Sequence, residues 1–377
     1  MSDPNPDHIL SDHSYCKGNF LNFCSLNVCG LESKVRLKIL EEYVNNFDFV
    51  GLVETKTDKV DDNIFLNHEY VALQKKDKKH KYGGIHGIGL LVKKKYYHEI
   101  AIINNGLSEN VLWIKLNKSI LGFETVLGII YIQHEGSPYH HDYIFDNLAE
   151  EIIEIRNNHQ CPMILLGDLN SRISNLSDVV DIEDEVAAHC NFDEEIVSDL
   201  FDCRQELELL GISETRFSCD TKVNNNGRKL LELCKSLNLK IVNGRIGTDG
   251  GIGNLTCHRP NGSSLIDYAI SSPSLFKYFH DFEIDIFDSN LSDSHCPVML
   301  SMSVSKAVAN RTTVQTHNKA LLDESKDILV TKWKHELADE YKNAFTHTEE
   351  DINRLINRID DLNADQVDQE TMNEVTK

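Results

Sequence analysis

The sequence lacks any apolar run that is long enough to cross a membrane. Its longest runs, such as Val126–Ile132 and Met163–Leu166, are far shorter than the roughly 20 residues that a membrane helix needs. The first sixteen residues contain no basic region followed by an apolar stretch, so they do not predict a signal peptide. We therefore expect an intracellular protein, nuclear or cytoplasmic, that has no membrane partner.

A disulfide framework is also absent from the pattern. The ten cysteines include no CxxC pair, and two of them, Cys24 and Cys257, lie inside apolar runs. This usage is typical of reduced thiols in the cytosol or nucleus rather than of a small secreted scaffold. The composition, with 41% hydrophobic and 26% charged residues, excludes disorder of the whole chain and indicates a globular protein.

Positive charge is scarce, with 38 Lys and Arg against 60 Asp and Glu, a net charge of −22. Most of the excess is local: residues 178–208 hold twelve acids and one Arg, and residues 310–377 hold fifteen acids and nine bases. A basic cluster lies elsewhere, at Lys75–Lys81 and Lys93–Lys95. Because association follows local potential, a phosphate-bearing ligand is not excluded. The lysines fit a solvated hairpin or a DNA contact equally well.

Short β-rich runs alternate with amphipathic helices from about residue 18 to residue 304. Twelve strands are too many for one open twisted sheet, so two packed sheets with outer helices are expected, an α/β four-layer sandwich. Hairpin-length turns between several strands predict mixed sheets. The expected strands are 20–27, 48–53, 70–75, 87–94, 110–117, 125–132, 162–167, 239–243, 254–257, 265–271, 282–288 and 297–303. The expected helices are Glu32–Asn45, His141–Asn158, Arg228–Leu237 and Pro273–Tyr278.

These elements predict three parts of the chain. Residues 1–17 form a flexible N-terminus, residues 18–304 form the sandwich, and residues 305–377 form an acidic helical tail. An acidic insert at 171–215 interrupts the sandwich, and we expect a helix within it at 193–210.

Polar residues stand at the ends of the predicted strands. In layered α/β folds, ligands bind at strand ends, so groups gathered there from distant parts of the sequence form a candidate active site. The residues concerned are Asn27, Glu54, Tyr131, Asp168, Asn170, Asp267 and His295.

The segments that hold these residues are LNVCGL, VETKTD, GGIHGIGLLV, LGDLNSR, SLIDYAISS and SDSHCPV. In this order, the series resembles the endonuclease/exonuclease/phosphatase superfamily over residues 18–304. The runs NNNGRKLLELCKSLNLKIVNGR and TCHRPNGSSLIDY resemble one branch of it, the apurinic/apyrimidinic-type endonuclease domains of non-LTR (LINE-type) retrotransposons. The resemblance implies a DNase I-like fold and a Mg²⁺-dependent enzyme, with Mn²⁺ as an alternative metal, that nicks double-stranded DNA without an obligate protein partner.

The chemistry of the residues agrees with that implication. Glu54 is a hard oxygen ligand suited to Mg²⁺, and Asn27 can hold that carboxylate or a metal-bound water. Asp168 is the expected base, and Asn170 is expected to hold a phosphate oxygen or the water. His295, made cationic by Asp267, would stabilise charge on the phosphate.

The remaining assignments complete this catalytic site. Tyr131 would donate a hydrogen bond to the phosphate. The resemblance further implies substrate contacts from Asn243, Thr256 and Arg259, with the segment 254–264 as the natural DNA reader.

Simpler roles stand beside these assignments. Asn27 could cap the following helix, Asp168 could belong to a turn, and Tyr131 could be a core aromatic residue. The spacing of three loop histidines matches no standard zinc site, so a solvated loop is favoured for His134, His140 and His141.

Two departures from the family pattern weaken the metal site. Cys29 stands where the family commonly has an acid, and Ser294 stands where an Asp usually precedes the histidine. Asp293 replaces that acid only if a bulge turns it inward, because adjacent residues of an extended chain point to opposite sides. Two alternatives therefore stay open. One is another phosphoesterase, acting on a phospholipid, an inositol phosphate or RNA, and the other is a binding module with a decayed site.

Overall fold

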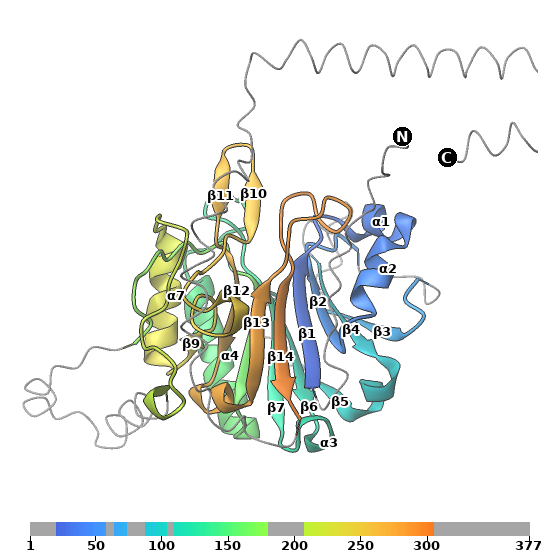
Figure 1. Ribbon diagram of the computed structural model, residues 1–377, viewed down its shortest axis with the longest axis horizontal. Helices are drawn as coiled ribbons and strands as arrows, with labels where there is room; N and C mark the ends of the chain where they lie inside the picture. The colour runs from blue at the N-terminus through green and yellow to red at the C-terminus, as the bar shows by residue number, and fades with distance from the viewer. Residues whose placement is uncertain (1–19, 58–63, 74–86, 104–108, 180–206, 305–377) are drawn as a thin grey trace, which may run out of the picture. The chain divides into compact units, whose positions relative to one another are not determined.

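The computed structural model describes residues 20–57, 64–73, 87–103, 109–179 and 207–304 (Figure 1). Four expectations therefore lie outside the described residues. They concern the N-terminus 1–17, most of the acidic insert with its helix 193–210, the lysines at 75–81 and the tail 305–377. Within the described part of the chain, no helix has the length and apolar character needed to cross a membrane.

The first six-stranded sheet is mixed, with the order β13-β14-β1-β2-β4-β3. Its strands are β1 (Phe20–Asn27), β2 (Phe49–Val53), β3 (His68–Ala72), β4 (Ile88–Lys93), β13 (Phe279–Ile284) and β14 (Val298–Ser303). β1 and β2 are parallel, and the other neighbouring pairs are antiparallel. The carboxyl ends of β1 and β2 therefore meet at one edge, where Asn27 pairs with Val53.

The second six-stranded sheet has the order β5-β6-β7-β8-β12-β9. Its strands are β5 (Ile100–Ile103), β6 (Val111–Leu116), β7 (Thr125–Tyr131), β8 (Met163–Asp168), β9 (Lys240–Ile241) and β12 (Asp267–Ser271). β7 and β8 are parallel and end together, with Tyr131 paired to Asp168. β12 runs antiparallel to β8, so its first residue, Asp267, lies opposite Asp168.

Three apolar clusters hold four layers together. The central cluster joins the facing sides of the two sheets, as Phe49 and Ile129 illustrate. The second cluster packs α2 (Ile39–Val44), which follows the short helix α1 (Leu31–Lys34), on the first sheet. The third packs α4 (Ile144–His159) and α7 (Asn225–Ser236) on the second sheet. Two packed mixed sheets with outer helices are visible in Figure 1, and the predicted sandwich is confirmed.

Some element predictions were wrong in detail. The helix expected at Glu32–Asn45 is broken, because Lys38 adopts a left-handed backbone with φ 57° between the 3-10 turn Val35–Leu37 and α2. The edge strand β5 was missed. Buried and exposed side chains do not alternate clearly along Ile100–Ile103, and Ile102 is 57% exposed. The segment therefore lacks the two-residue period that predicts a strand.

The region before β12 also differs from the expected strand 254–257. It forms a separate two-stranded hairpin, β10 (Cys257–Arg259) and β11 (Gly262–Ser264). The expected strand 282–288 is β13, which begins and ends earlier, at 279–284. The remaining short elements are α3 (Lys118–Leu121) and the 3-10 turns Lys94–Glu99, Gly247–Asp249 and Pro273–Tyr278.

Candidate active site

Polar side chains from both sheets meet at the edge where the parallel pairs end. Asn27 and Glu54 come from the first sheet, and Tyr131 and Asp168 come from the second. Asp267 begins β12 opposite Asp168, and His295 lies in the loop before β14. The two sheets thus contribute to one site, although its members lie up to 268 positions apart in the sequence.

Asn27 connects the carboxylates of the two sheets. Its Nδ2 donates to Glu54 Oε1 and to Asp168 Oδ2, both at 3.0 Å. Its Oδ1 accepts from the backbone N of Cys29 at 3.0 Å, so it does not cap α1, whose N-cap is Gly30. Tyr131 adds a second hydrogen bond to Glu54 Oε1, at 2.9 Å. Asn27 therefore holds the Glu54 carboxylate, one of the two roles predicted for it.

Three residues of the site have left-handed backbones, with φ 52° at Cys29, 51° at Glu54 and 47° at Asn170. Asn tolerates this region, whereas Cys and Glu adopt it at a cost of about 1–3 kcal/mol each. Such strain persists only where the surroundings fix the backbone. Here the turn that follows each strand aims the side chain along the edge of the sheet.

Asp168 is the buried centre of the site, with 1% of its surface exposed. Its Oδ1 accepts from the backbone N of Asn170 at 2.9 Å. Gly167 precedes it with φ 153°, and a Cβ there would lie 1.9 Å from the carbonyl oxygen of Ile130, so only glycine lets β8 approach β7. Burial, and then the nearby charge of Asp267, raise the pKa of Asp168 to about 7. A carboxylate with this pKa is suited to accept a proton near neutral pH.

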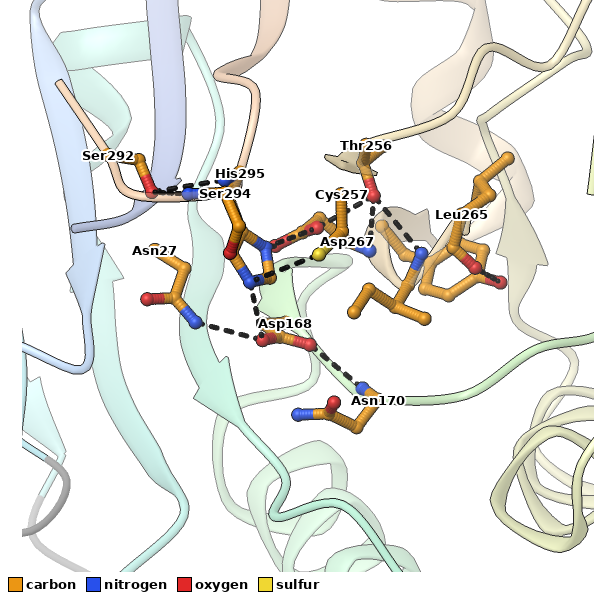
Figure 2. Close-up of polar contacts among 12 residues, drawn as sticks. Asn27, Asp168, Asn170, Thr256, Cys257, Leu265, Asp267, Ser292, Ser294 and His295 are labelled. Carbon is orange, nitrogen blue, oxygen red and sulfur yellow. Dashed lines mark hydrogen bonds and ion pairs between the residues drawn. The ribbon is translucent and has the colours of Figure 1, made fainter. Parts of the chain in front are cut away.

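His295 and Asp267 form a buried pair (Figure 2). His295 Nδ1 donates to Asp267 Oδ2 at 2.9 Å, and its Nε2 faces Asp168 Oδ2 at 3.9 Å. Burial by itself would lower the pKa of His295, but the Asp267 carboxylate outweighs it and holds the pKa well above its ordinary value. The raised pKa favours the cationic form of the imidazole, and the ring lies between two carboxylates.

Thr256 fixes the carboxylate of this pair. Its hydroxyl donates to Asp267 Oδ2 at 2.6 Å and accepts from the backbone N of Ile266 and of Asp267. The side chain is fully buried. Asn243 is fully buried as well, and its amide bonds the backbone of β12 at Asp267 and Ala269. Neither side chain reaches the surface, so both act on Asp267 and β12 rather than on a ligand outside.

The other expected residues are more open. Asn170 is half-buried, and its Nδ2 donates to the carbonyl oxygen of Ile132 at 2.9 Å. Arg259 is exposed on the hairpin that stands above β12 in Figure 1. Burial would lower the pKa of Arg259, but nearby thiol and carboxylate groups, Cys257 and Asp168 among them, raise it. Arg259 lies two residues after Cys257, whose bridge with His295 joins this hairpin to the site.

Asp293 does not turn inward. Its Oδ1 accepts from Lys34 Nζ at 2.6 Å, and its side chain is 68% exposed. Ser294 is 8% exposed, and its hydroxyl lies 4.0 Å from Cys29 Sγ. The position before the histidine thus presents a hydroxyl, and the neighbouring Asp293 carboxylate is exposed and bound to the buried Lys34.

Two contacts of His295 were not foreseen from the sequence. Ser292 Oγ accepts from the backbone N of His295 at 3.1 Å, and Cys257 Sγ lies 3.6 Å from its Nε2. A β-bridge between Cys257 and His295 joins the hairpin to the loop. Ser292 lies three positions before the histidine, so its contact could have been proposed from the sequence. The contact of Cys257 could not, because nothing in the sequence pairs it with a residue 38 positions away.

The lysines at 93–95 lie away from this site. Lys93 and Lys95 pair with Asp48, each at 3.3 Å, at the start of β2, whereas Glu54 follows its end. Lys94 pairs with Glu69 at 3.8 Å. These three lysines therefore belong to a charged surface at the opposite edge of the first sheet, and the DNA contact considered for them is not favoured.

The donor set fits a hard divalent cation. Ligand atoms of Asp168, Asp267 and His295 lie within 4.8 Å of one another. Glu54, whose side chain is 18% exposed, adds a carboxylate beside Asp168 through Asn27. Carboxylate oxygens suit Mg²⁺ and Mn²⁺. A protonated imidazole has no free nitrogen for a metal, so the carboxylates of Glu54, Asp168 and Asp267 are the candidate ligands.

Comparison with known proteins identifies a family and several similar folds. The model of the Endonuclease/Exonuclease/phosphatase family matches residues 24–289. No curated protein matches the chain. Among solved structures, the chain is similar to the AP endonuclease LMAP from Leishmania major, with 15% identity, a TM-score of 0.50, and coverage of 76% of this chain and 88% of that one.

Two further solved structures resemble it. One is the endonuclease domain of TRAS1, a telomere-specific non-LTR retrotransposon, with 11% identity, a TM-score of 0.46, and coverage of 76% of this chain and 100% of that one. The other is the 3'-5' exonuclease NExo from Neisseria meningitidis, with 15% identity, a TM-score of 0.47, and coverage of 75% and 100%. At such identities these likenesses concern the fold alone.

Proposed function

Because the chain belongs to the endonuclease/exonuclease/phosphatase family, we propose that it is a Mg²⁺-dependent endonuclease that nicks one strand of double-stranded DNA. The observation that carries the proposal is the continuous set of contacts from Glu54 through Asn27 to Asp168, and on to His295 and Asp267. In this set Glu54 would be the cation-binding carboxylate, Asp168 the base and His295 the imidazolium. Phosphodiester hydrolysis needs these three functions together.

Each residue has a defined part in the reaction. Asp168 accepts a proton from the attacking water, whose oxygen forms the new bond to phosphorus as the 3′-oxygen departs. His295, held cationic by Asp267, stabilises the negative charge that develops on the phosphate oxygens. Glu54 would hold a divalent cation, which supplies charge neutralisation at the phosphate. Tyr131 and Asn27 keep the Glu54 carboxylate oriented through its Oε1.

Double-stranded DNA is the proposed substrate because the projecting β10–β11 hairpin presents an arginine near the catalytic groups. The β10–β11 hairpin carries Arg259 and is joined to His295 by the bridge at Cys257. Arginine contacts to phosphates position a nucleic acid, and a hairpin of this length can enter a groove. Arg259 is therefore the proposed substrate contact, while Thr256 and Asn243 position β12 and Asp267.

Conversion of supercoiled plasmid to the open-circular form under a Mg²⁺ titration tests the proposal. We expect nicking by the wild-type chain and a loss of at least about 100-fold in Asp168→Asn. Asp146→Asn, an exposed carboxylate change in α4, serves as the matched control and should nick like the wild type. Parallel assays with RNA, a phospholipid and an inositol phosphate complete the panel. Turnover of one of these without plasmid nicking would replace the DNA assignment, and no turnover at all would favour a binding module.

A further inference from the structure

A pocket of about 420 Å³ opens between the β7–α4 loop and the start of α7. It is lined by Glu135, His140, His141, Asp142, Tyr143 and Asn225. Pockets of this size accommodate small organic groups. None of the catalytic residues proposed above lines this pocket.

Hydrogen bonds fasten the pocket to the catalytic edge. Asn226 Nδ2 donates to the carbonyl oxygen of Gln133, two residues after Tyr131. Asn224 Nδ2 donates to the carbonyl oxygen of Asn170 at 2.9 Å. The loop that leaves β7 and the cap of α7 are therefore held to the strand ends that carry the site. The walls of the pocket are therefore tied to the segments that follow Tyr131 and Asp168.

Two rings form a wall that suits a flat, aromatic group. The His141 and Tyr143 rings are stacked, with an interplanar angle of 3° and centroids 5.4 Å apart. Tyr143 is 55% exposed, so part of its surface is open to solvent. Stacking of a nucleobase on exposed aromatic rings is a sequence-tolerant form of nucleic-acid binding.

The charges of the pocket argue against a phosphate as its occupant. Glu135 already occupies the positive end of α7, because its Oε1 accepts from the backbone N of Asn226 at 2.5 Å. Asp142 places a second carboxylate in the wall. Carboxylates repel phosphate but accept hydrogen bonds from amino groups, such as those on the edges of guanine, cytosine and adenine.

A metal ion is also disfavoured as the occupant. His140 Nε2 donates to Asn226 Oδ1 at 2.8 Å, which uses that nitrogen as a donor. Among the described residues, the metal-ligand cluster that the structure contains is the catalytic one, Asp168 with Asp267 and His295. The occupant that fits both the rings and the carboxylates is an uncharged base with amino groups.

We propose that this pocket binds a nucleobase of the strand being cut, next to the scissile phosphate, by stacking it on the His141–Tyr143 pair. The proposal rests on the proposed function for the identity of the strand. It adds a determinant of specificity: bases that present amino groups to Glu135 and Asp142 are favoured over thymine. Extruded or unpaired bases are read in this way, by stacking and by hydrogen bonds to the base edge.

A fluorescent base analogue tests the pocket without any cleavage. A single-stranded oligonucleotide with one 2-aminopurine, titrated with the full chain in EDTA, reports stacking as quenching of its fluorescence. We expect Tyr143→Ala to weaken this binding by about tenfold. Tyr143→Phe keeps the ring and should bind like the wild type. Tyr143 makes no side-chain cap to α4, so its removal should not cost the helix a hydrogen bond.

The chain offers a matched control in a second exposed Tyr–His contact. Tyr97 is 39% exposed and lies against His98, with ring centroids 5.7 Å apart, in the turn after β4. This turn follows the end of β4 that is opposite to the active site, so Tyr97→Ala should bind like the wild type. Thermal unfolding of each variant shows whether it is folded.

The outcomes separate this proposal from the proposed function. Binding that is unchanged in a folded Tyr143→Ala variant, or absent in the wild type, overturns the pocket even if plasmid nicking is intact. Binding that depends on Tyr143, together with failure to nick any DNA, leaves the pocket and removes the endonuclease assignment. If Tyr143→Ala is unfolded, His141→Ala replaces it, with the same tenfold expectation.

Discussion

Replacing Thr256 by valine removes the group that orders Asp267. The hydroxyl makes three hydrogen bonds: it donates to Asp267 Oδ2 at 2.6 Å and accepts from the backbone N of Ile266 at 3.1 Å and of Asp267 at 3.0 Å. Valine has nearly the same shape, so no cavity forms, but all three bonds are lost. Two buried N–H groups then lack this acceptor, and a buried carboxylate loses its shortest hydrogen bond.

The expected magnitude follows from these three losses. A buried donor left unsatisfied costs about 1–3 kcal/mol, and a hydrogen bond to a charged group contributes about 1.5–3 kcal/mol. Because such losses are not additive, we expect Thr256→Val to lower the free energy of unfolding by about 4 kcal/mol. Equilibrium unfolding in urea measures this value, and Thr256→Ser, which keeps the hydroxyl, is the matched control.

The same variant distinguishes a positioning role from a substrate contact. If Thr256 acts through Asp267, plasmid nicking should show a lower kcat with little change in KM. A raised KM with unchanged kcat would instead support the substrate contact predicted from the sequence. A Thr256→Val protein that unfolds within about 0.5 kcal/mol of the wild type would refute the reasoning about the three bonds.

Three further outcomes are expected. Glu54→Gln should reduce Mg²⁺-dependent nicking by about 100-fold. Its unfolding should match that of the wild type, because the amide oxygen can still accept hydrogen bonds from Asn27 and Tyr131. Full nicking activity in this variant would exclude Glu54 as the metal ligand. Ser294→Asp should lower the Mg²⁺ concentration for half-maximal nicking by roughly tenfold, since the wild-type carboxylate at 293 is held outward; an unchanged requirement would contradict this.

The third expected outcome concerns the buried Asp178–Arg245 pair, which joins at 2.7 Å. Burial would raise the pKa of Asp178, but the charge of Arg245 outweighs burial and lowers that pKa. The ion pair therefore stabilises the fold above the unfolded-state pKa of about 3.9. This stabilisation is lost as the pH falls through the lower folded-state pKa. Asp178→Asn should therefore cost about 3–5 kcal/mol at pH 7 in urea unfolding, with a smaller difference at pH 2; an equal difference at both pH values would contradict the assignment.

Much of the sandwich could be predicted because buried strands carry a strong local signal. β7 and β8, for example, are continuous apolar runs whose ends are marked by polar residues. The broken helix at Lys38 and the edge strand β5 were missed because their conformations depend on contacts with other elements. Local periodicity contains no information on those contacts.

The members of the candidate site were visible for a similar reason. Glu54 and Asp168 follow apolar strands directly, and parallel strands bring their carboxyl ends to one edge. The hydrogen bond from Asn27 to Glu54 was only one of the roles left open for that residue, and its bond to Asp168 was not predicted. Which group Asn27 binds depends on where the neighbouring side chains point. The left-handed backbone at Glu54 and the meeting of the two sheets decide these directions.

The sequence by itself determined most of the buried strands and the chemical groups available at their ends, because these follow from local hydrophobicity and residue type. Only the tertiary structure decided which groups touch, since contacts such as that between Asn27 and Asp168 join residues 141 positions apart. It also decided that the exposed Asp293 binds Lys34 while the buried Ser294 faces Cys29. Neighbouring residues share a sequence context, but the path of the backbone sends their side chains to different sides.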